Sequence, residues 1–302
     1  MKKKFTFRRG LQYCIYKYPM LTSHLSDKTY LKLMYWVCIG KKLDLRNPET
    51  YNEKLQWLKL YDRNPMYPAM ADKFAAKEII TEKIGEGYVA KNFAVWDTAE
   101  EIDFDILPDQ FVIKCTHDCG GMVICSDKQK LNREQAREKI AKALNTNYYS
   151  SGREWPYSQV KPRIIVEEYL EDKKTGELRD YKFFTFNGVP KMLFVASERQ
   201  SKNAETKFDF FDMDYKHLDI INGHPNASAP PVKPENFELM KELAAKLSAG
   251  IPHLRVDFYE VNGKVYVGEL TFFHWSGFTP FEPDSWDRMM GEWIALPIIS
   301  NN

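Results

Sequence analysis

Two carboxylates interrupt an apolar hairpin near the C-terminus. The stretch RVDFYEVNGKVYVGELTFF, residues 255–273, places β-prone residues on both sides of an Asn-Gly pair, which is typical of a hairpin. Asp257 stands in the first arm and Glu269 in the second. Mg²⁺ commonly takes one or two carboxylates together with phosphate oxygens. The pattern therefore predicts a metal site, with an exposed strand face carrying two unrelated acids as the alternative.

The length of the turn decides whether these two acids share a face, because side chains alternate along a strand. A strict two-residue loop at Asn262-Gly263 would turn them to opposite faces. A three-residue loop over 261–263 would put both on one face, at a diagonal spacing of roughly 7–8 Å, together with Arg255 and Thr271. We therefore expect a loop of three residues, or another odd number, unless a bulge intervenes.

A lysine and a glycine pair occur in a second hairpin, FVIKCTHDCGGMVIC, residues 111–125. Lys114 ends an apolar strand, and Gly120-Gly121 lie in the loop after it. Glycines let backbone N–H groups approach an anion, and a lysine neutralises phosphate charge, so this order fits a hairpin that covers phosphate. A P-loop would need the lysine after the glycines. One alternative is an ordinary Gly-Gly hairpin. The other is a zinc site built from Cys115, His117, Cys119 and Cys125, although no CxxC pair occurs.

The strand RIIVEEYL, residues 163–170, carries Glu167-Glu168 near its end. A connecting strand can present backbone N–H and C=O groups to an adenine edge, and adjacent acids can hold ribose hydroxyls or amines. The alternative is a strand that simply leaves the core.

The remaining elements mix helices with hairpins. Helical spacing predicts short helices in residues 1–70 and longer ones at 72–85, 132–145 and 234–250, with Asp72 and Asn132 as N-caps. A further hairpin is expected at 181–198. This order predicts an α+β fold with a largely antiparallel sheet.

Composition excludes some classes of protein. The chain of 302 residues has 43 basic and 42 acidic residues, so nothing global points to nucleic acid. No run approaches the roughly 20 apolar residues of a spanning helix, and five cysteines without a secretory signal predict a reduced, cytoplasmic protein. The first 20 residues carry basic side chains and no acid. They are either a solvated basic end or a segment attracted to the anionic inner face of a membrane.

In this order the segments resemble the ATP-grasp superfamily, and more closely the TupA-like ATP-grasp family, named for a teichuronopeptide-biosynthesis protein. The similar stretches are LRNPETYNEKLQWLKLYDRNP, DYKFFTFNG and the C-terminal hairpin, and the resemblance covers about residues 40–297. It implies two α+β lobes that clasp ATP, after a small helical region at 1–70. The ATP-grasp domain would span 71–302, with a lid at about 105–165 and a metal-binding lobe at about 166–297.

The same resemblance implies roles for individual residues. Thr271 stands where many ATP-grasp enzymes have a metal-binding Asn, which puts a second metal ion in doubt. The ATP contacts would come from Lys73, Lys114, Gly120, Gly121, Glu167, Glu168, Tyr169 and Leu170. Mg²⁺ would be held by Asp257, Glu269 and Thr271, and the transferring phosphoryl group would face Arg255 and Lys182. His274 is a candidate substrate contact.

The implied reaction is carboxylate–amine ligation through an acyl phosphate, with ATP and Mg²⁺ as cofactors. The substrates would be a sugar uronic acid and an amino acid or amine, in the synthesis of a cell-surface polysaccharide, with a lipid-linked acceptor suited to the basic N-terminus. The rival interpretations are a glycosyltransferase that uses the DxD pair Asp212 and Asp214, a sugar kinase on the same fold, and a binding module without catalysis.

Overall fold

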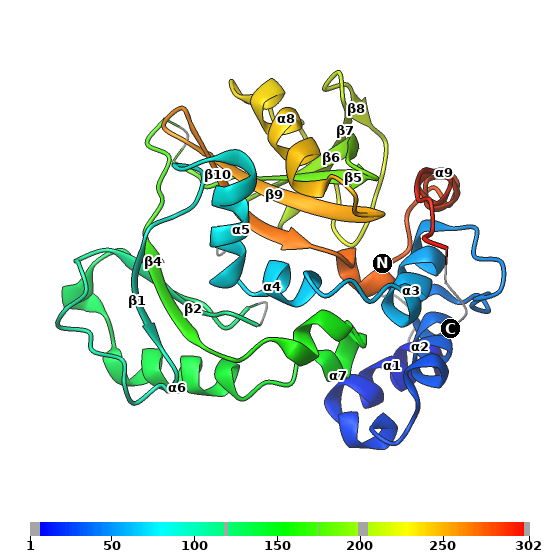
Figure 1. Ribbon diagram of the computed structural model, residues 1–302, viewed down its shortest axis with the longest axis horizontal. Coiled ribbons are helices and arrows are strands. Elements are labelled where there is room, and N and C mark those ends of the chain that lie inside the picture. Colours follow the sequence, from blue (N-terminus) through cyan, green and yellow to red (C-terminus); the bar gives the residue numbers. More distant parts are fainter. Residues whose placement is uncertain (1–6, 118–119, 175, 199–204, 299–302) are drawn as a thin grey trace.

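The computed structural model describes residues 7–117, 120–174, 176–198 and 205–298, and within them the chain forms two antiparallel sheets flanked by helices (Figure 1). The four-stranded sheet has the order β1-β4-β2-β3. Its strands are β1 (Asn92–Trp96), β2 (Phe111–Cys115), β3 (Val123–Cys125) and β4 (Ile164–Glu168). The six-stranded sheet has the order β10-β9-β5-β6-β7-β8. Its strands are β5 (Asp180–Phe186), β6 (Val189–Ser197), β7 (Lys207–Asp212), β8 (His217–Leu218), β9 (His253–Val261) and β10 (Lys264–Thr271).

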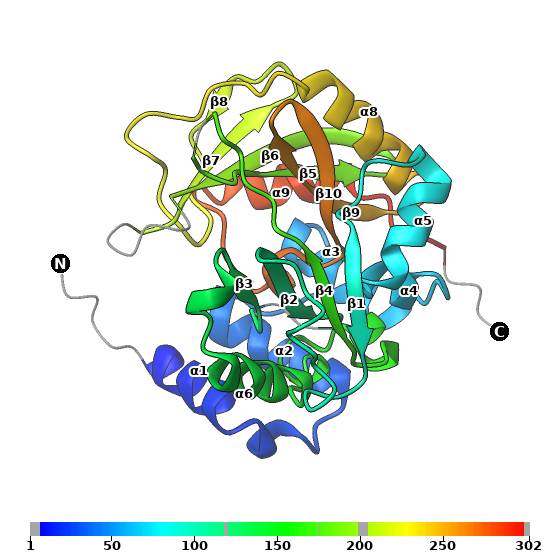
Figure 2. The same cartoon turned by 90° about the vertical axis from the view of Figure 1, so that its left-hand side faces the viewer.

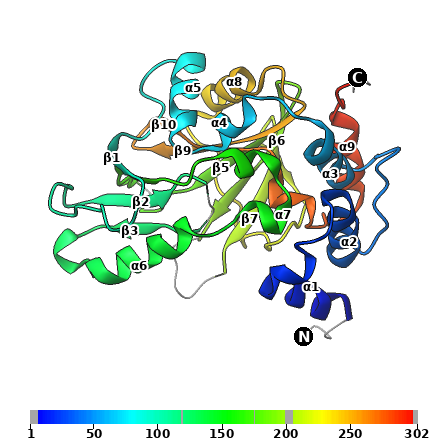
Figure 3. The same ribbon diagram turned by 60° about the horizontal axis from the view of Figure 1, so that its bottom comes forward.

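Helices cover both sheets and build a separate group at one end. The α-helices are α1 (Phe7–Lys17), α2 (Asp27–Ile39), α3 (Tyr51–Tyr61), α4 (Tyr67–Ala71), α5 (Ala75–Ile84), α6 (Arg133–Leu144), α7 (Tyr149–Gly152), α8 (Phe237–Ser248) and α9 (Ser285–Trp293). Short 3₁₀ turns are η1 (Pro19–Thr22), η2 (Lys128–Lys130), η3 (Trp155–Gln159) and η4 (His274–Gly277). Figure 3 shows α6 lying along β2 and β3, with α2, α3 and α9 gathered at the opposite end. No helix of the described residues has the length and apolar character needed to cross a membrane.

Local signals in the sequence account for most of these boundaries. The Asn132 side chain accepts a hydrogen bond from the Gln135 N–H at 3.0 Å, as expected for an N-cap of α6. Asp72 also accepts from backbone N–H groups, those of Phe74 and Ala75, but the helix begins only at Ala75. Strand β1 was not predicted, because its alternating pattern is short.

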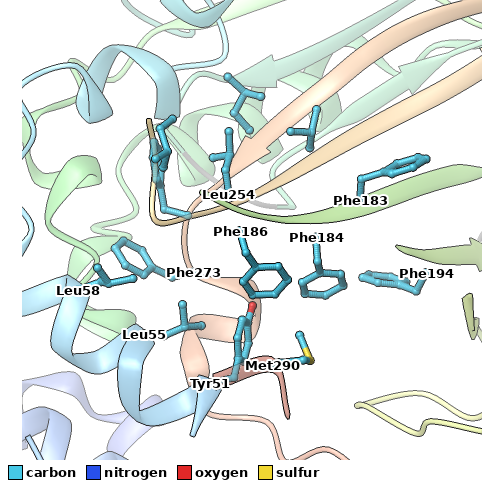
Figure 4. Packing of buried hydrophobic residues seen from close by; sticks show 14 of the residues in the cluster. Tyr51, Leu55, Leu58, Phe183, Phe184, Phe186, Phe194, Leu254, Phe273 and Met290 are labelled. Atoms are coloured by element: carbon cyan, nitrogen blue, oxygen red, sulfur yellow. The ribbon is translucent and has the colours of Figure 1, made fainter. Parts of the chain in front are cut away.

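Strand β5 is the centre of the larger core, and its side chains pack on both faces of the sheet. Phe183 contacts Phe237 of α8 on one face, with ring centroids 5.7 Å apart. Phe184 and Phe186 lie on the other face against Tyr51 of α3 (Figure 4). Because both faces are covered, the strand is apolar at consecutive positions rather than at alternate ones. A second, smaller core lies between the four-stranded sheet and α6. The division into a 1–70 region and an ATP-grasp domain with two lobes stays a prediction.

The C-terminal hairpin corrects the predicted loop. Val261 pairs with Lys264, so Asn262 and Gly263 form a two-residue loop, and both have positive φ, at 52° and 80°, as a type I′ turn requires. The three-residue loop was therefore wrong. The register instead shifts between Val267 and Glu269, where Gly268 forms a bulge.

This bulge places the two acids on the same face of the hairpin, as the three-residue loop would have done. Asp257 pairs directly with Glu269, and Arg255 pairs with Thr271. The two acids are therefore direct cross-strand neighbours, closer than the expected diagonal pair. Glycine suits position 268, because a Cβ there would lie 2.6 Å from the ring of Tyr259.

Helix α9 packs closely against the start of α3 at Gly291. A Cβ added to Gly291 would lie 2.1 Å from the backbone oxygen of Glu49 and 2.8 Å from the carbonyl carbon of Thr50. Next to this contact, the Asp287 carboxylate accepts a hydrogen bond from the Asn52 N–H at 2.9 Å. The close approach fixes the helical group against the segment that leads into Tyr51.

Gly291→Ala should therefore destabilise the protein, although Gly→Ala inside a helix ordinarily stabilises it by about 1 kcal/mol. The added methyl group meets backbone atoms that cannot rotate away, and overpacking of this kind costs about 1–3 kcal/mol. Chemical denaturation measures the change. Glu292→Ala, at the exposed neighbouring position, is the control; a Gly291→Ala protein as stable as this control would contradict the close contact.

Candidate functional site

A cavity of about 220 Å³ opens where the two sheets approach each other. Its walls come from α4 and α5, from β2, β3 and the end of β4, and from the β9–β10 hairpin. Figure 2 shows α5 and this hairpin next to the four-stranded sheet, and the Val267 N–H donates to the Tyr88 carbonyl at 2.7 Å, which ties β10 to the segment between α5 and β1. Of the residues predicted to contact ATP, six line this cavity: Lys73, Lys114, Glu167, Glu168, Tyr169 and Leu170.

Glu167 lies between two lysines at one side of this cavity. Its carboxylate is 2.5 Å from Lys114 Nζ and 2.6 Å from Lys77 Nζ. The sheet explains the contact, because Glu167 pairs with Val112 and Lys114 is the next residue of β2 on that face. Although burial raises the pKa of Glu167, the ammonium groups of Lys114 and Lys77 lower it below its ordinary value.

This pairing refines the predicted roles of the two acids. Glu167 positions two cations that face the cavity, which is a different task from holding a ribose. Glu168 accepts a hydrogen bond from the Lys91 N–H at 2.8 Å and also lines the cavity, and its contact with a ribose hydroxyl stays a prediction. Lys77 lines the cavity too, and its place one turn after Lys73 on a predicted helix was the signal that could have marked it.

The glycine loop lies beside the cavity and is described only in part. Gly120 has φ 121°, a conformation that favours glycine, and none of the described residues has an atom within 4 Å of where its Cβ would be. Gly121 follows it, and neither is among the residues that line the cavity. The role of the two glycines as a phosphate lid stays a prediction.

A buried cluster of charges lies at the base of the C-terminal hairpin. Arg255 donates to both oxygens of Asp257, from Nε at 2.7 Å and from a terminal nitrogen at 2.8 Å, and to the Thr271 hydroxyl at 3.0 Å. Lys182 donates to Asp257 from the neighbouring strand, since Lys182 pairs with Asp257 across β5 and β9. It also lies 3.5 Å from Asp180.

Burial and the attraction between opposite charges shift the pKa values of these groups in opposite directions. Burial lowers the pKa of Lys182, an effect that Asp257 partly offsets. Burial raises the pKa of Asp257, but Arg255 and Lys182 bring it below its ordinary value. The opposite charges therefore offset part of the cost of burying the three groups together.

His274 makes a further hydrogen bond with Arg255. Because a guanidinium can only donate, His274 Nδ1 accepts from Arg255 at 2.8 Å, and the ring proton is on Nε2, which donates to Asn222 Oδ1 at 2.8 Å. Burial, together with the positive charge of Arg255, lowers the pKa of His274, so the ring is neutral. Its main contacts are thus with Arg255 and Asn222, although it lines a neighbouring cavity as well.

The oxygen donors at the hairpin suit Mg²⁺ in type and number. Asp257, Glu269 and Thr271 lie on one face of adjacent strands, and Mg²⁺ needs only one or two carboxylates when phosphate oxygens complete its shell. Both Asp257 oxygens already accept from cations, so Mg²⁺ would bind Asp257 in exchange for one of them. Within the described residues no three His, Cys, Asp or Glu side chains are grouped to hold a metal by themselves.

A second cavity, of about 490 Å³, lies on the other side of Glu269. Arg255, Lys182, Thr271 and Glu269 line it, and Glu269 also lines the first cavity. Two further polar groups of its wall, Glu154 and Ser276, were not predicted, because no motif marks the segments in which they lie.

The residues of the rival interpretations have structural roles. Asp212 Oδ1 accepts from the N–H groups of Asp214 at 3.0 Å and Lys216 at 2.8 Å, so this acid caps a turn after β7. Cys125 pairs with Phe111 at one end of β2, whereas Cys115 is at the other end. Cys119 lies outside the described residues, as do Lys2, Lys3 and Lys4 of the basic N-terminus.

Removing the charge of Glu167 should weaken the fold near this cavity. Glu167→Gln leaves two partly buried ammonium groups without their carboxylate, and breaking such a pair costs about 3–5 kcal/mol. Since the folded-state pKa is lowered, the stabilisation is present above the unfolded pKa of about 4.5 and is lost as the pH falls through the folded pKa. Denaturant titrations of both proteins from pH 7 downward measure this difference.

The matched control is Glu168→Gln, which retains an oxygen that can accept from the Lys91 N–H. Its stability should stay within about 0.5 kcal/mol of the parent protein. A difference between the parent and Glu167→Gln that does not shrink in acid would refute the ionic role of Glu167.

One family of known proteins matches most of the chain. The model of the family described as TupA-like ATPgrasp matches residues 53–295. A search of curated proteins finds no match.

Solved structures of several ligases are distantly similar. A D-alanine–D-alanine ligase from Bacillus anthracis, complexed with ATP, is 16% identical with a TM-score of 0.42 over 68% of this chain and 55% of its own. The ATP-grasp ligase PsnB, complexed with minimal precursor, Mg and ADP, is 11% identical with a TM-score of 0.40 over 85% of this chain and 65% of its own. A Helicobacter pylori D-alanine–D-alanine ligase is 12% identical with a TM-score of 0.42 over 82% of this chain and 70% of its own. The chain thus spans little more than half the length of the first of these structures.

The family match covers most of the chain, from α3 to the segment after α9. The predicted α+β fold of the ATP-grasp type is thereby confirmed, whereas the ligase activity and the cofactors ATP and Mg²⁺ belong to the proposed function. The chain belongs to the TupA-like ATP-grasp family.

Proposed function

We propose that this protein is a carboxylate–amine ligase that works through an acyl phosphate. One substrate is a sugar uronic acid and the other is an amino acid or amine, and the product is an amide in a cell-surface polysaccharide of the capsular or teichuronic type. The polysaccharide setting follows from the family resemblance, and the two-substrate chemistry is supported by the site.

The observation that carries the proposal is the meeting of two cavities at Glu269. The first is lined by lysines, by the end of β4 and by the hairpin, as a nucleotide with a phosphate tail would need. The second begins at Arg255 and Lys182, where the phosphates would end. A carboxylate entering from the second cavity would meet the terminal phosphate beside these two cations.

The cluster around Asp257 gives the site what phosphoryl transfer requires. Such transfers depend mainly on positioning and on stabilisation of developing negative charge. When bound, Mg²⁺ would neutralise the phosphate oxygens from Asp257 and Glu269. Arg255 is held by Asp257, Thr271 and His274, and Lys182 is beside it, so the two cations can orient the attacking carboxylate.

Product release separates this function from its rivals. Purified protein with Mg-ATP, offered panels of sugar acids and amino acids, should release ADP and phosphate only when an acid and an amine are both present. ADP without phosphate would identify a sugar kinase, and UDP released from UDP-sugars would identify a glycosyltransferase. Release that needs no second substrate would contradict the ligase.

Glu269→Gln should weaken the contribution of Mg²⁺ to nucleotide binding. The substitution keeps the shape of the side chain but removes the charge, and the apparent affinity for Mg²⁺ in the presence of ATP should fall by more than about 10-fold. Titration calorimetry with ATP at a series of Mg²⁺ concentrations measures this without turnover.

Glu242→Gln on the exposed face of α8 is the matched control and should bind like the parent protein. Equal Mg²⁺ dependence in Glu269→Gln and the control would remove Glu269 from the metal site.

A further inference from the structure

Most of the wall of the second cavity has no role in the phosphoryl transfer proposed above. Beyond Arg255 and Lys182, the cavity extends to the segment from α7 to η3 and to the turn η4. These segments contribute one carboxylate, that of Glu154, together with several hydroxyl groups and aromatic rings. The inference drawn from them rests on the proposed ligase function, since it concerns the second substrate of that reaction.

Glu154 is the carboxylate of this wall, and its surroundings leave it short of positive charge. Its residue surface is 6% exposed, yet it lines the cavity. Among the residues that the structure describes, no cationic side chain lies within 4.0 Å of its carboxylate. Burial raises the pKa of Glu154, while Lys59, the Ser276 hydroxyl and Arg255 act in the opposite direction and Glu269 adds to the rise. A buried carboxylate without a direct counter-ion is costly, and a cation in the cavity would remove that cost.

Lys59 is the nearest buried cation, but its hydrogen bonds go elsewhere. It is 1% exposed, and its Nζ donates to the carbonyl of Gly152 at 2.7 Å and to the carbonyl and hydroxyl of Ser276 at 2.7 and 2.8 Å. Lys59 thus joins the two segments on either side of Glu154. It fixes the wall of the cavity without occupying the place of a ligand.

The turn held by Lys59 has a backbone that few residues adopt. Trp275 and Ser276 have φ of 47° and 56°, both in the left-handed region, which costs roughly 1–2 kcal/mol for each such residue. This backbone conformation places Trp275 at the wall of the cavity, and 43% of the residue surface is exposed. Strained backbone of this kind persists at ligand sites when the surrounding contacts determine it.

Aromatic rings make up much of the remaining wall. Tyr148 and Tyr157 lie edge to face with ring centroids 5.1 Å apart, and Phe273 lines the cavity near Trp275. The faces of such rings attract ammonium groups and pack against apolar stems. The wall therefore suits a cationic group on a small organic body better than a second anion.

We propose that this cavity binds the amine substrate and that Glu154 is the catalytic residue that holds its ammonium group and takes its proton. The acid substrate would enter from the side of Arg255 and Lys182, and the amine from the side of Glu154. The two substrates would then be sorted by charge within one cavity.

The proton balance of the reaction gives Glu154 a defined step. An ammonium group must lose a proton before its nitrogen can attack, and the carboxylate of Glu154 accepts it. The nitrogen then forms a bond to the carbonyl carbon of the acyl phosphate, and the bond from that carbon to the phosphate oxygen breaks. The second proton leaves the nitrogen with the departing phosphate, and Glu154 returns its own proton to solvent.

Glu154→Gln tests this role with two amines of different charge. The probes are glycinamide, which is largely an ammonium ion at pH 7.5, and hydroxylamine, which is uncharged there, each with Mg-ATP and D-glucuronate. The variant should lose at least about 30-fold in kcat/KM for glycinamide, while hydroxamate formation with hydroxylamine stays within about 3-fold of the parent. Glu134→Gln, an exposed position at the start of α6, is the matched control.

Other outcomes overturn the proposal in distinguishable ways. Full activity of Glu154→Gln with glycinamide refutes the proton transfer, and equal losses with both amines mean that Glu154 only supports the fold. If the parent protein forms no product with either amine, the ligase function fails for this acid. Binding of glycinamide, followed by saturation-transfer NMR, then decides the amine site alone: weaker binding in Glu154→Gln supports it, and unchanged binding overturns it.

Discussion

The site depends on one buried carboxylate that is shared by two cations. Asp257 accepts from both Arg255 and Lys182, and each of those cations reaches it from a different position in the sheet. Without Asp257, two positive groups would be left buried together, and without the cations the carboxylate would be unpaired. The attraction of Asp257 for both cations therefore holds the cluster together before any ligand arrives. In the proposed function, Mg²⁺ held by Asp257 would replace one of these contacts, and the cation released from it would face the phosphate and the carboxylate.

The first cavity repeats this arrangement of one acid between two cations. Glu167 is a single acid between Lys77 and Lys114, and those lysines come from α5 and β2, which otherwise belong to different layers. The carboxylate keeps two like charges close enough to serve one polyanionic ligand. Both clusters lie on elements of regular structure rather than on loops, so their geometry is set before substrates bind.

Hydrophobic patterning and short motifs made much of this predictable. Lys114, Asp257 and Glu269 stand in apolar strands where a charge is unexpected, and that contrast marks them in the sequence. Glu154 and Lys59 gave no such signal, because their significance comes from contacts between segments about 90 or more residues apart, such as that of Lys59 with Gly152. The wrong turn length has a similar origin. The alternation of side chains along a strand identified which residues must share a face, but it could not distinguish a longer loop from a bulge at Gly268.

That bulge divides the hairpin into a tip that can change in length and a base that cannot. On the side of the tip, from Val261 to Lys264, the pairing is regular, so the turn can be exchanged or lengthened by two residues without altering which face the acids occupy. Between the bulge and Thr271 there is no such freedom, because a single inserted residue would invert Thr271 and an insertion beside Glu269 would turn its carboxylate away from Asp257. The hairpin can therefore vary at its tip, whereas the residues at its base must keep their register for the acids to share one face.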